Sequence, residues 1–122
     1  MKDLIDHYLV AYNSFDVDDM LSLLSQDVRF ENYSDDQLTA ATSGISEFKQ
    51  LAEQSKSMFS EREQRVTDLK LNDDSAIATI AFHGKLAADI PNGPPAGTVL
   101  DLQGKSEFSF CNGQITKIID RS

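Results

Sequence analysis

The sequence has little cysteine, few basic residues and no long apolar run. Its 122 residues include one cysteine, Cys111, so no disulfide bond can form within the chain. Eleven Lys and Arg are outnumbered by 20 Asp and Glu, which gives a net charge of −9. Because nucleic acids and anionic membranes are bound chiefly by clustered basic side chains, we expect neither of them as a partner.

Hydrophobic targeting and membrane signals are also missing from the sequence. No stretch approaches the roughly 18 apolar residues of a membrane-spanning helix. The first residues, Met1 to His7, contain no apolar run of the kind found in a signal peptide. A single cysteine suits a reducing compartment. We therefore expect a cytoplasmic protein.

The residue patterns that bind metals and phosphate groups are absent as well. The two histidines are far apart, and no group of side chains has the spacing of a zinc site. Asp16, Asp18 and Asp19 partly match a calcium loop, but the required glycine and terminal glutamate are missing. No glycine-rich loop suggests phosphate binding. We expect no metal and no cofactor.

Apolar residues at three- and four-residue spacing predict three helices. The first covers residues 2–14 and carries one apolar stripe that includes Tyr8 and Tyr12. Asp16 is a candidate N-cap for a second, short helix that ends near residue 25. Ser46 is a candidate N-cap for a third helix that reaches residue 58 or 59.

Alternation of apolar and polar residues predicts five strands. Ser34 to Ser43 is predicted to be a polar loop, and Asn112-Gly113 is typical of a tight hairpin turn. The order of helix, helix, strand, helix and four strands predicts a single α+β domain over residues 1–122. The predicted strands cover residues 27–33, 63–71, 76–83, 100–110 and 114–121.

Four segments resemble the nuclear transport factor 2-like superfamily, and residues 89–122 are similar to its SnoaL-like branch. The segments are residues 12–20, 27–30, 44–48 and 110–115. This resemblance implies a cystatin-like cone, in which N-terminal helices pack on a curved antiparallel sheet with a mixed edge. It also implies an apolar pocket for a hydrophobic small molecule and a homodimer formed through the outer sheet face. The superfamily contains both enzymes and binding proteins, so the fold alone does not settle the chemistry.

Ketosteroid isomerase, a member of this superfamily, uses a tyrosine and two acidic groups. The resemblance aligns these groups with Ala11, Asn32 and Ser106, or with Gly104 in place of Ser106 if the hairpin register differs. None of these residues retains the required group, since an amide is no proton-shuttling base. We therefore do not expect steroid isomerisation by that mechanism.

Asp120 and His83 are the two candidate catalytic residues. The resemblance to SnoaL-like cyclases implies an acid near the end of the sheet, and Asp120 is the nearest counterpart. A plain two-residue hairpin would pair Ser106 with Ile119 and turn Asp120 to the outer face. There Asp120 would be solvated or would form a salt bridge. A bulge would reverse this alternation. His83 ends a strand that looks buried, on the side opposite Phe82, and histidine is a common acid or base in enzymes.

The sequence leaves two functions open. The first is an acid/base enzyme, a cyclase, isomerase, dehydratase or hydrolase that acts on a hydrophobic substrate. The second is a non-catalytic ligand-binding or dimerisation module, favoured by the loss of all three isomerase groups. Core packing is the alternative role for the two tyrosines. The expected ligand-binding residues are Tyr8, Tyr12, Phe30, Asn32, Phe48, Phe82, Ser106 and Phe108.

Overall fold

The first helices form where the apolar spacing predicts them. The computed structural model describes residues 1–122, with α1 at Lys2–Asn13 and α2 at Val17–Ser22. Helix α1 buries its apolar stripe, including Ile5 and Tyr8. The Asp16 carboxylate accepts a hydrogen bond from the Asp19 amide, which confirms the predicted cap of α2.

Helix α3, at Ile45–Ser57, begins differently from the prediction. Its N-cap is Gly44, which adopts a φ of 88° that suits a residue without a Cβ atom. Ser46 lies within the helix and does not cap it, so the predicted cap is wrong. The Glu47 carboxylate accepts a hydrogen bond from the Ser43 amide at 2.9 Å. A carboxylate from the first helical turn thus accepts the hydrogen bond of a backbone N–H group just before the helix.

Six strands form one curved sheet in the order β2-β1-β6-β5-β4-β3. Strands β1 and β6 are parallel, and every other neighbouring pair is antiparallel. The predicted loop over residues 34–43 is wrong, because most of it forms the edge strand β2. The strands are β1 (Leu24–Ser34), β2 (Gln37–Ser43), β3 (Phe59–Leu71), β4 (Ser75–Leu86), β5 (Val99–Cys111) and β6 (Gln114–Arg121).

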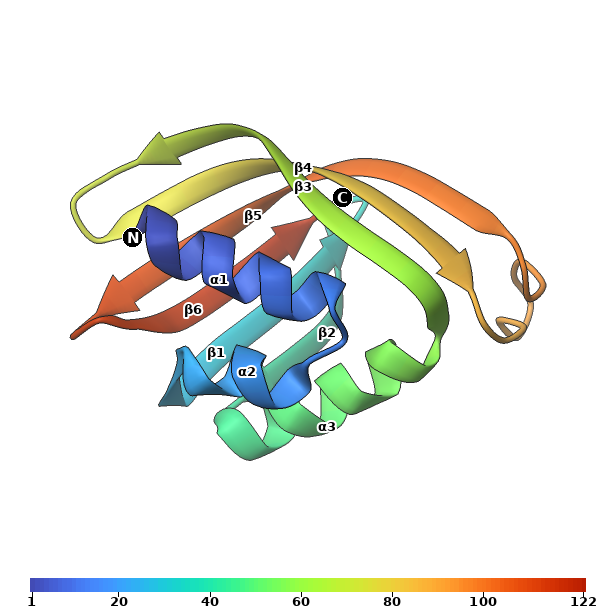
Figure 1. The fold of residues 1–122 in the computed structure, drawn as a ribbon, viewed down its shortest axis with the longest axis horizontal. Coiled ribbons are helices and arrows are strands. Elements are labelled where there is room, and N and C mark those ends of the chain that lie inside the picture. The colour runs from blue at the N-terminus through green and yellow to red at the C-terminus, as the bar shows by residue number, and fades with distance from the viewer.

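All three helices lie on one face of the sheet, and the long strands β3 and β4 curve over them (Figure 1). Alternate residues of β4, Ala76, Ala78 and Ile80, are buried on this inner face. They join Phe108 and Ile118 of the central strands in one hydrophobic core. This arrangement confirms the predicted α+β cone, with a sheet that is mixed at one pairing.

A bulge near the start of β6 sets which of its side chains face inward. Phe110 pairs with Ile115, but Ser109 pairs with Lys117, so Thr116 is an extra residue. From there on, Phe108 pairs with Ile118 and Ser106 pairs with Asp120. The bulge therefore turns Asp120 to the inner face, which a regular hairpin would not do.

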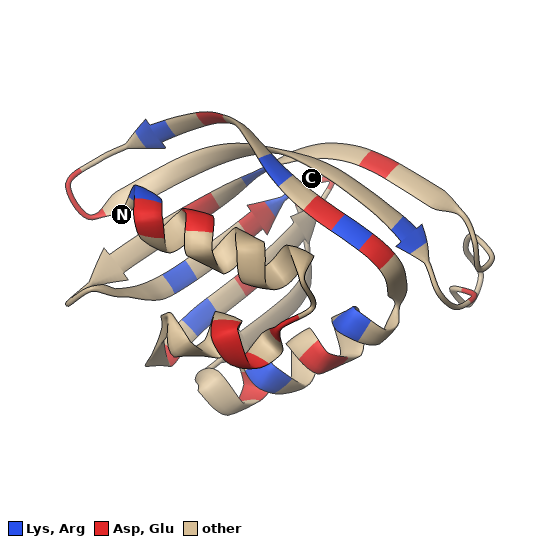
Figure 2. Cartoon of the chain, viewed as in Figure 1, with Lys and Arg blue, Asp and Glu red and all other residues tan.

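The outer face of the sheet carries charges of both signs. Basic and acidic residues are interspersed along β3 (Figure 2). Arg121 and Glu107 form an ion pair at 2.6 Å between neighbouring strands. None of the three helices has the length and hydrophobicity needed to cross a bilayer.

Candidate functional site

A cavity with two adjoining lobes lies between the helices and the inner face of the sheet. The apolar lobe has a volume of about 340 Å³, and nine of its 14 lining residues are hydrophobic. The polar lobe has about 190 Å³ and lies where β5 extends past the end of β6. Four residues line both lobes: Tyr12, Asn32, Gln64 and Asp120.

Asp120 is the titratable carboxyl at the junction of the two lobes. The bulge in β6 directs it inward, where the Ser106 hydroxyl donates a hydrogen bond to Asp120 Oδ1 at 2.7 Å. Burial raises the pKa of Asp120 to about 6, and the Ser106 hydrogen bond partly opposes this rise. Asp120 is thus an acid whose pKa is close to neutrality.

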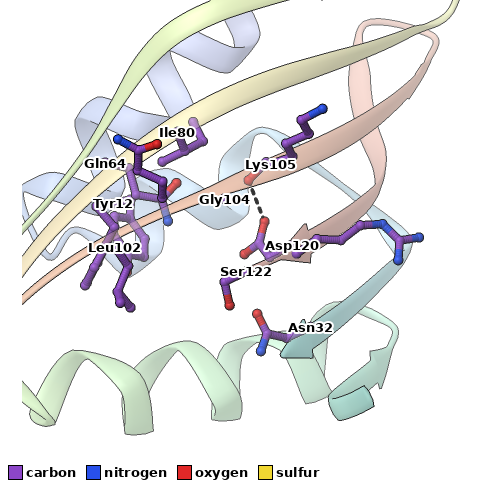
Figure 3. A pocket seen from close by; sticks show the side chains of 13 residues that line it. Tyr12, Asn32, Gln64, Ile80, Leu102, Gly104, Lys105, Asp120 and Ser122 are labelled. Carbon is purple, nitrogen blue, oxygen red and sulfur yellow. Dashed lines mark hydrogen bonds between the residues drawn. The ribbon is translucent and has the colours of Figure 1, made fainter. Parts of the chain in front are cut away.

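The chain end approaches β5 closely beside this carboxyl. Gly104, two residues before Ser106, has no side chain, and a Cβ atom there would collide with the carbonyl oxygen of Arg121. A larger residue at this position would push the end of β6 away. Figure 3 shows Asp120, Asn32 and Ser122 on one side of the polar lobe, with Tyr12, Gln64 and Leu102 across from them.

Two tyrosines of α1 contribute to the wall of the apolar lobe. Tyr8 is 6 % exposed and packs edge-to-face against Phe108, with 6.1 Å between ring centroids. Burial raises the pKa of Tyr8 well above its ordinary value, and the nearby Asp120 adds to this rise. Burial likewise raises the pKa of Tyr12. Both phenols therefore stay protonated, and both can donate hydrogen bonds.

Strand β1 and helix α3 supply the opposite wall. Phe30 and Phe48 pack edge-to-face, with 5.7 Å between ring centroids, and both line the apolar lobe. Asn32 lies beside Asp120 in the parallel β1–β6 register. The Asn32 amide donates a hydrogen bond to Thr39 Oγ1 at 2.7 Å. The cavity thus has an aromatic wall that ends in a polar group next to Asp120.

Three expected site residues lie elsewhere or play a different role. His83 is half-exposed outside the cavity, and its Nδ1 lies 2.8 Å from Asp101 Oδ1. Ile80 and Phe82 of β4 face inward, and His83 faces the opposite, outer side of the sheet. His83 is therefore separated from Asp120. Phe108 is 1 % exposed and packs in the core behind Tyr8, so it lines neither lobe. Phe82 lines the polar lobe and not the apolar one.

Arg62 and Gln64 both line the apolar lobe, and neither was predicted as a site residue from the sequence. Arg62 is only 6 % exposed, although arginine is normally a surface residue. Arg62 and Gln64 are two residues apart in β3 and so share one face of the strand, which the sequence alone could have indicated. This face is the inner one, but its polar residues resemble those of a solvated strand.

The residues that align with the ketosteroid isomerase groups supply no acid or base in this cavity. Ala11 is buried in the core at 1 % exposure and offers no side-chain donor. Ser106 acts as a donor to Asp120, and Asn32 is the amide next to it. What the apolar lobe can supply chemically is one carboxyl with a pKa near neutrality, two phenol donors and one guanidinium, set among mostly hydrophobic residues.

Comparisons with known proteins agree with this architecture. The sequence profile described as the SnoaL-like domain matches residues 5–118. A search of curated proteins finds no significant match. A solved structure of a proposed polyketide cyclase from Xanthomonas campestris pv. campestris superposes with a TM-score of 0.84 at 24% identity. This match covers 99% of the present chain and 88% of the Xanthomonas chain.

Two further structures have the same fold at lower identity. AclR, a proposed hydroxylase from Streptomyces galilaeus, has a TM-score of 0.77 at 18% identity, and the match covers 98% of this chain and 85% of AclR. A protein from Catenulispora acidiphila with a ketosteroid isomerase-like fold, solved with trimethylamine, has a TM-score of 0.79 at 13% identity. That match covers 96% of this chain and 82% of the other.

Proposed function

The chain belongs to the SnoaL-like domain family, a branch of the nuclear transport factor 2-like superfamily, and on this premise we propose that it is an acid/base enzyme acting on a hydrophobic small molecule. Asp120 is the proposed proton-transfer group. The observation that carries the proposal is the position of Asp120, which is part-buried at the junction of the two lobes and has a pKa of about 6. Catalytic acids and bases work best when their pKa lies near the operating pH.

The cavity supports removal of a proton from a carbon next to a carbonyl group. At pH 7 about nine-tenths of Asp120 is ionised, given a pKa of about 6. The carboxylate takes the proton, and the electron pair of the C–H bond moves to the carbonyl oxygen to form an enolate. Tyr8 and Tyr12 remain protonated and can donate hydrogen bonds to this oxygen. The enolate carbon then attacks a second carbonyl carbon, whose π electron pair moves to its own oxygen, and that oxygen takes the proton from Asp120, as in a cyclisation. Alternatively, the proton on Asp120 returns to another carbon of the enolate system, as in an isomerisation.

The size and polarity of the cavity support a small, largely apolar substrate. The apolar lobe, with about 340 Å³, is at the lower end of the range typical of ligand pockets. Its aromatic wall suits a ring or chain of carbon atoms. The polyketide cyclase proposed for the Xanthomonas structure would act on such a molecule, and this agrees with the chemistry suggested for Asp120.

Proton exchange tests the proposal without knowledge of the natural substrate. We would incubate the protein with 2-tetralone in D₂O at pD 7 and follow loss of the α-proton signals by ¹H NMR. We expect the wild type to accelerate exchange and Asp120→Asn to lose at least about 100-fold of that acceleration, the low end of general-base contributions. His83→Asn is the matched control and keeps wild-type exchange. Equal rates for the wild type and Asp120→Asn would overturn the catalytic role of Asp120.

A non-catalytic binding module is the second candidate function. The loss of acid/base groups at Ala11, Asn32 and Ser106 favours it. Saturable binding of 2-tetralone, seen in the same samples by line broadening, with no accelerated exchange would support this alternative. Binding with exchange supports the enzyme.

We also propose that the outer sheet face forms a homodimer and that the protein is cytoplasmic. The outer face of β5 offers Asp101, Gln103, Lys105 and Glu107, a set of both charge signs that can complement a second copy. Native mass spectrometry reports the subunit number and any ligand retained during purification. A monomer at micromolar concentration would contradict the dimer.

A further inference from the structure

Arg62 is a buried positive charge without an acidic partner. It lines the apolar lobe and is 6 % exposed. Six ion pairs form in the structure, and none of them includes Arg62. Because an isolated buried charge is strongly disfavoured, an unpaired guanidinium in the wall of a cavity is suited to pair with an anionic ligand.

Three contacts hold the guanidinium in place and leave most of its donors free. Its central carbon lies 3.7 Å from the centroid of the Tyr12 ring and 4.6 Å from that of Phe15. Arg62 Nε donates a hydrogen bond to the Tyr12 carbonyl oxygen at 3.0 Å. The Tyr12 side chain also interacts with the guanidinium, but no carboxylate pairs with either terminal nitrogen. The paired N–H groups of these nitrogens form the fork that binds a carboxylate in a bidentate manner.

The surrounding backbone is also adapted to hold Arg62. Phe15 has a φ of 59°, in the left-handed region that a bulky side chain rarely adopts. This conformation places its ring near the guanidinium. The Asn13 carboxamide both donates to the Gln64 carbonyl and accepts from the Gln64 amide, at 3.2 and 2.7 Å. These bonds tie the end of α1 to β3 two residues beyond Arg62.

We propose that Arg62 binds the carboxylate of an amphipathic ligand, whose apolar body fills the apolar lobe and whose reactive carbon lies at Asp120. This inference rests on the proposed function, and it adds a substrate class, the hydrophobic carboxylic acids. The lobe contains a single cationic side chain, which matches a singly charged carboxylate better than a phosphate dianion.

Arg62 and Asp120 act on different parts of the ligand. Both line the apolar lobe, but they do not form an ion pair. The pKa of Asp120 is set by burial and by Ser106, with no contribution from Arg62. Arg62 therefore fixes one end of the ligand, and the carboxyl of Asp120 remains available for proton transfer.

Binding of 2-naphthoate and of 2-naphthamide tests the inference, because the two share a ring system and differ in charge. We would titrate each by isothermal calorimetry at pH 7 into the wild type, Arg62→Met and Arg65→Met. Arg65 lies three residues along β3 and is exposed, so its substitution removes the same charge outside the cavity. We expect the wild type and Arg65→Met to bind the carboxylate at least about tenfold more tightly than the amide, and Arg62→Met to lose this preference.

The outcomes separate this inference from the proposed function. If the amide binds and the carboxylate binds no more tightly to the wild type, the role of Arg62 is wrong and the apolar ligand site stands. If neither probe binds, the proposed ligand site itself fails. Should circular dichroism show that Arg62→Met is unfolded, Arg62→Lys replaces it, and we expect a preference lowered several-fold by loss of the bidentate fork. An unchanged preference in Arg62→Lys would overturn bidentate binding.

Discussion

Asp120 and Asp101 are the same side chain on neighbouring strands, but they face opposite sides of the sheet. Asp120 lies inward on β6, hydrogen-bonded by Ser106, and burial raises its pKa to about 6. Asp101 lies outward on β5, with 74% of its side chain exposed, and pairs with His83. Each carboxyl therefore has one partner. The difference in environment, and not the residue type or the presence of a partner, makes Asp120 the one suited to proton transfer.

Asp120→Asn is expected to stabilise the protein at neutral pH, which is the largest effect that separates the two sites. The pKa of Asp120 rises from 3.8 in the unfolded chain to about 6 in the fold. Between these values the unfolded chain loses the proton while the folded state keeps it, so the free energy of unfolding falls as the pH rises. Above pH 6 the full penalty applies, on the order of 2–3 kcal/mol.

Urea unfolding at pH 4, 5, 6 and 7 measures this stability difference. We expect the wild type to lose stability across the window and Asp120→Asn to lose much less, so that the variant is the more stable protein at pH 7. Asp101→Asn is the control, and it should follow the wild-type dependence. A variant at Asp120 that is less stable than the wild type at pH 7 would show that the carboxyl is hydrated and not enclosed.

Removal of the Ser106 hydroxyl is expected to destabilise the ionised form of Asp120 by about 1.5–3 kcal/mol, the size of one hydrogen bond to a charged group. In Ser106→Ala the ionised form of Asp120 loses its one hydrogen bond, so the pKa of Asp120 rises further above 6. A carboxyl titration by ¹³C NMR measures the change directly. The pH profile of 2-tetralone exchange should move upward by the same amount. Ser106→Thr keeps the hydroxyl and serves as the control. An unchanged pKa of Asp120 in Ser106→Ala would show that this hydrogen bond does not influence the pKa.

Much of the fold follows from local sequence patterns. The helix stripes, the Asp16 cap and the Asn112-Gly113 turn are all present, with both turn residues at positive φ. Strand β2 was missed because Gln37–Ser43 is an edge strand that is mostly exposed and lacks clear alternation. A strand of this kind forms because β1 offers it hydrogen-bonding partners, which a local pattern does not reveal.

The site was harder to predict because it depends on one extra residue. The inward direction of Asp120 comes from the bulge at Thr116, which regular alternation does not include. Ile115 and Ile118 are both buried although they are three residues apart, and a regular strand cannot place such residues on one face. This apolar spacing was the sequence feature that could have indicated the bulge. Arg62 was missed because a buried arginine is rare, so charge in a strand suggested solvent exposure.

The smallest expected effect is at the outer pair. Within a single copy of the chain both side chains of the His83–Asp101 pair are largely hydrated. In His83→Ala, where the Asp101 carboxylate loses its partner, we therefore expect a change below about 0.5 kcal/mol in the free energy of unfolding of the monomer. Urea unfolding at low salt and again in 1 M NaCl checks this, because screening should remove what difference remains. The same variant should leave the proton exchange rate at its wild-type value. A loss of 2 kcal/mol or of exchange activity would mean that the outer pair is covered, as in a dimer, and that the contrast between the two aspartates is one of subunit contact and not of burial within the cone.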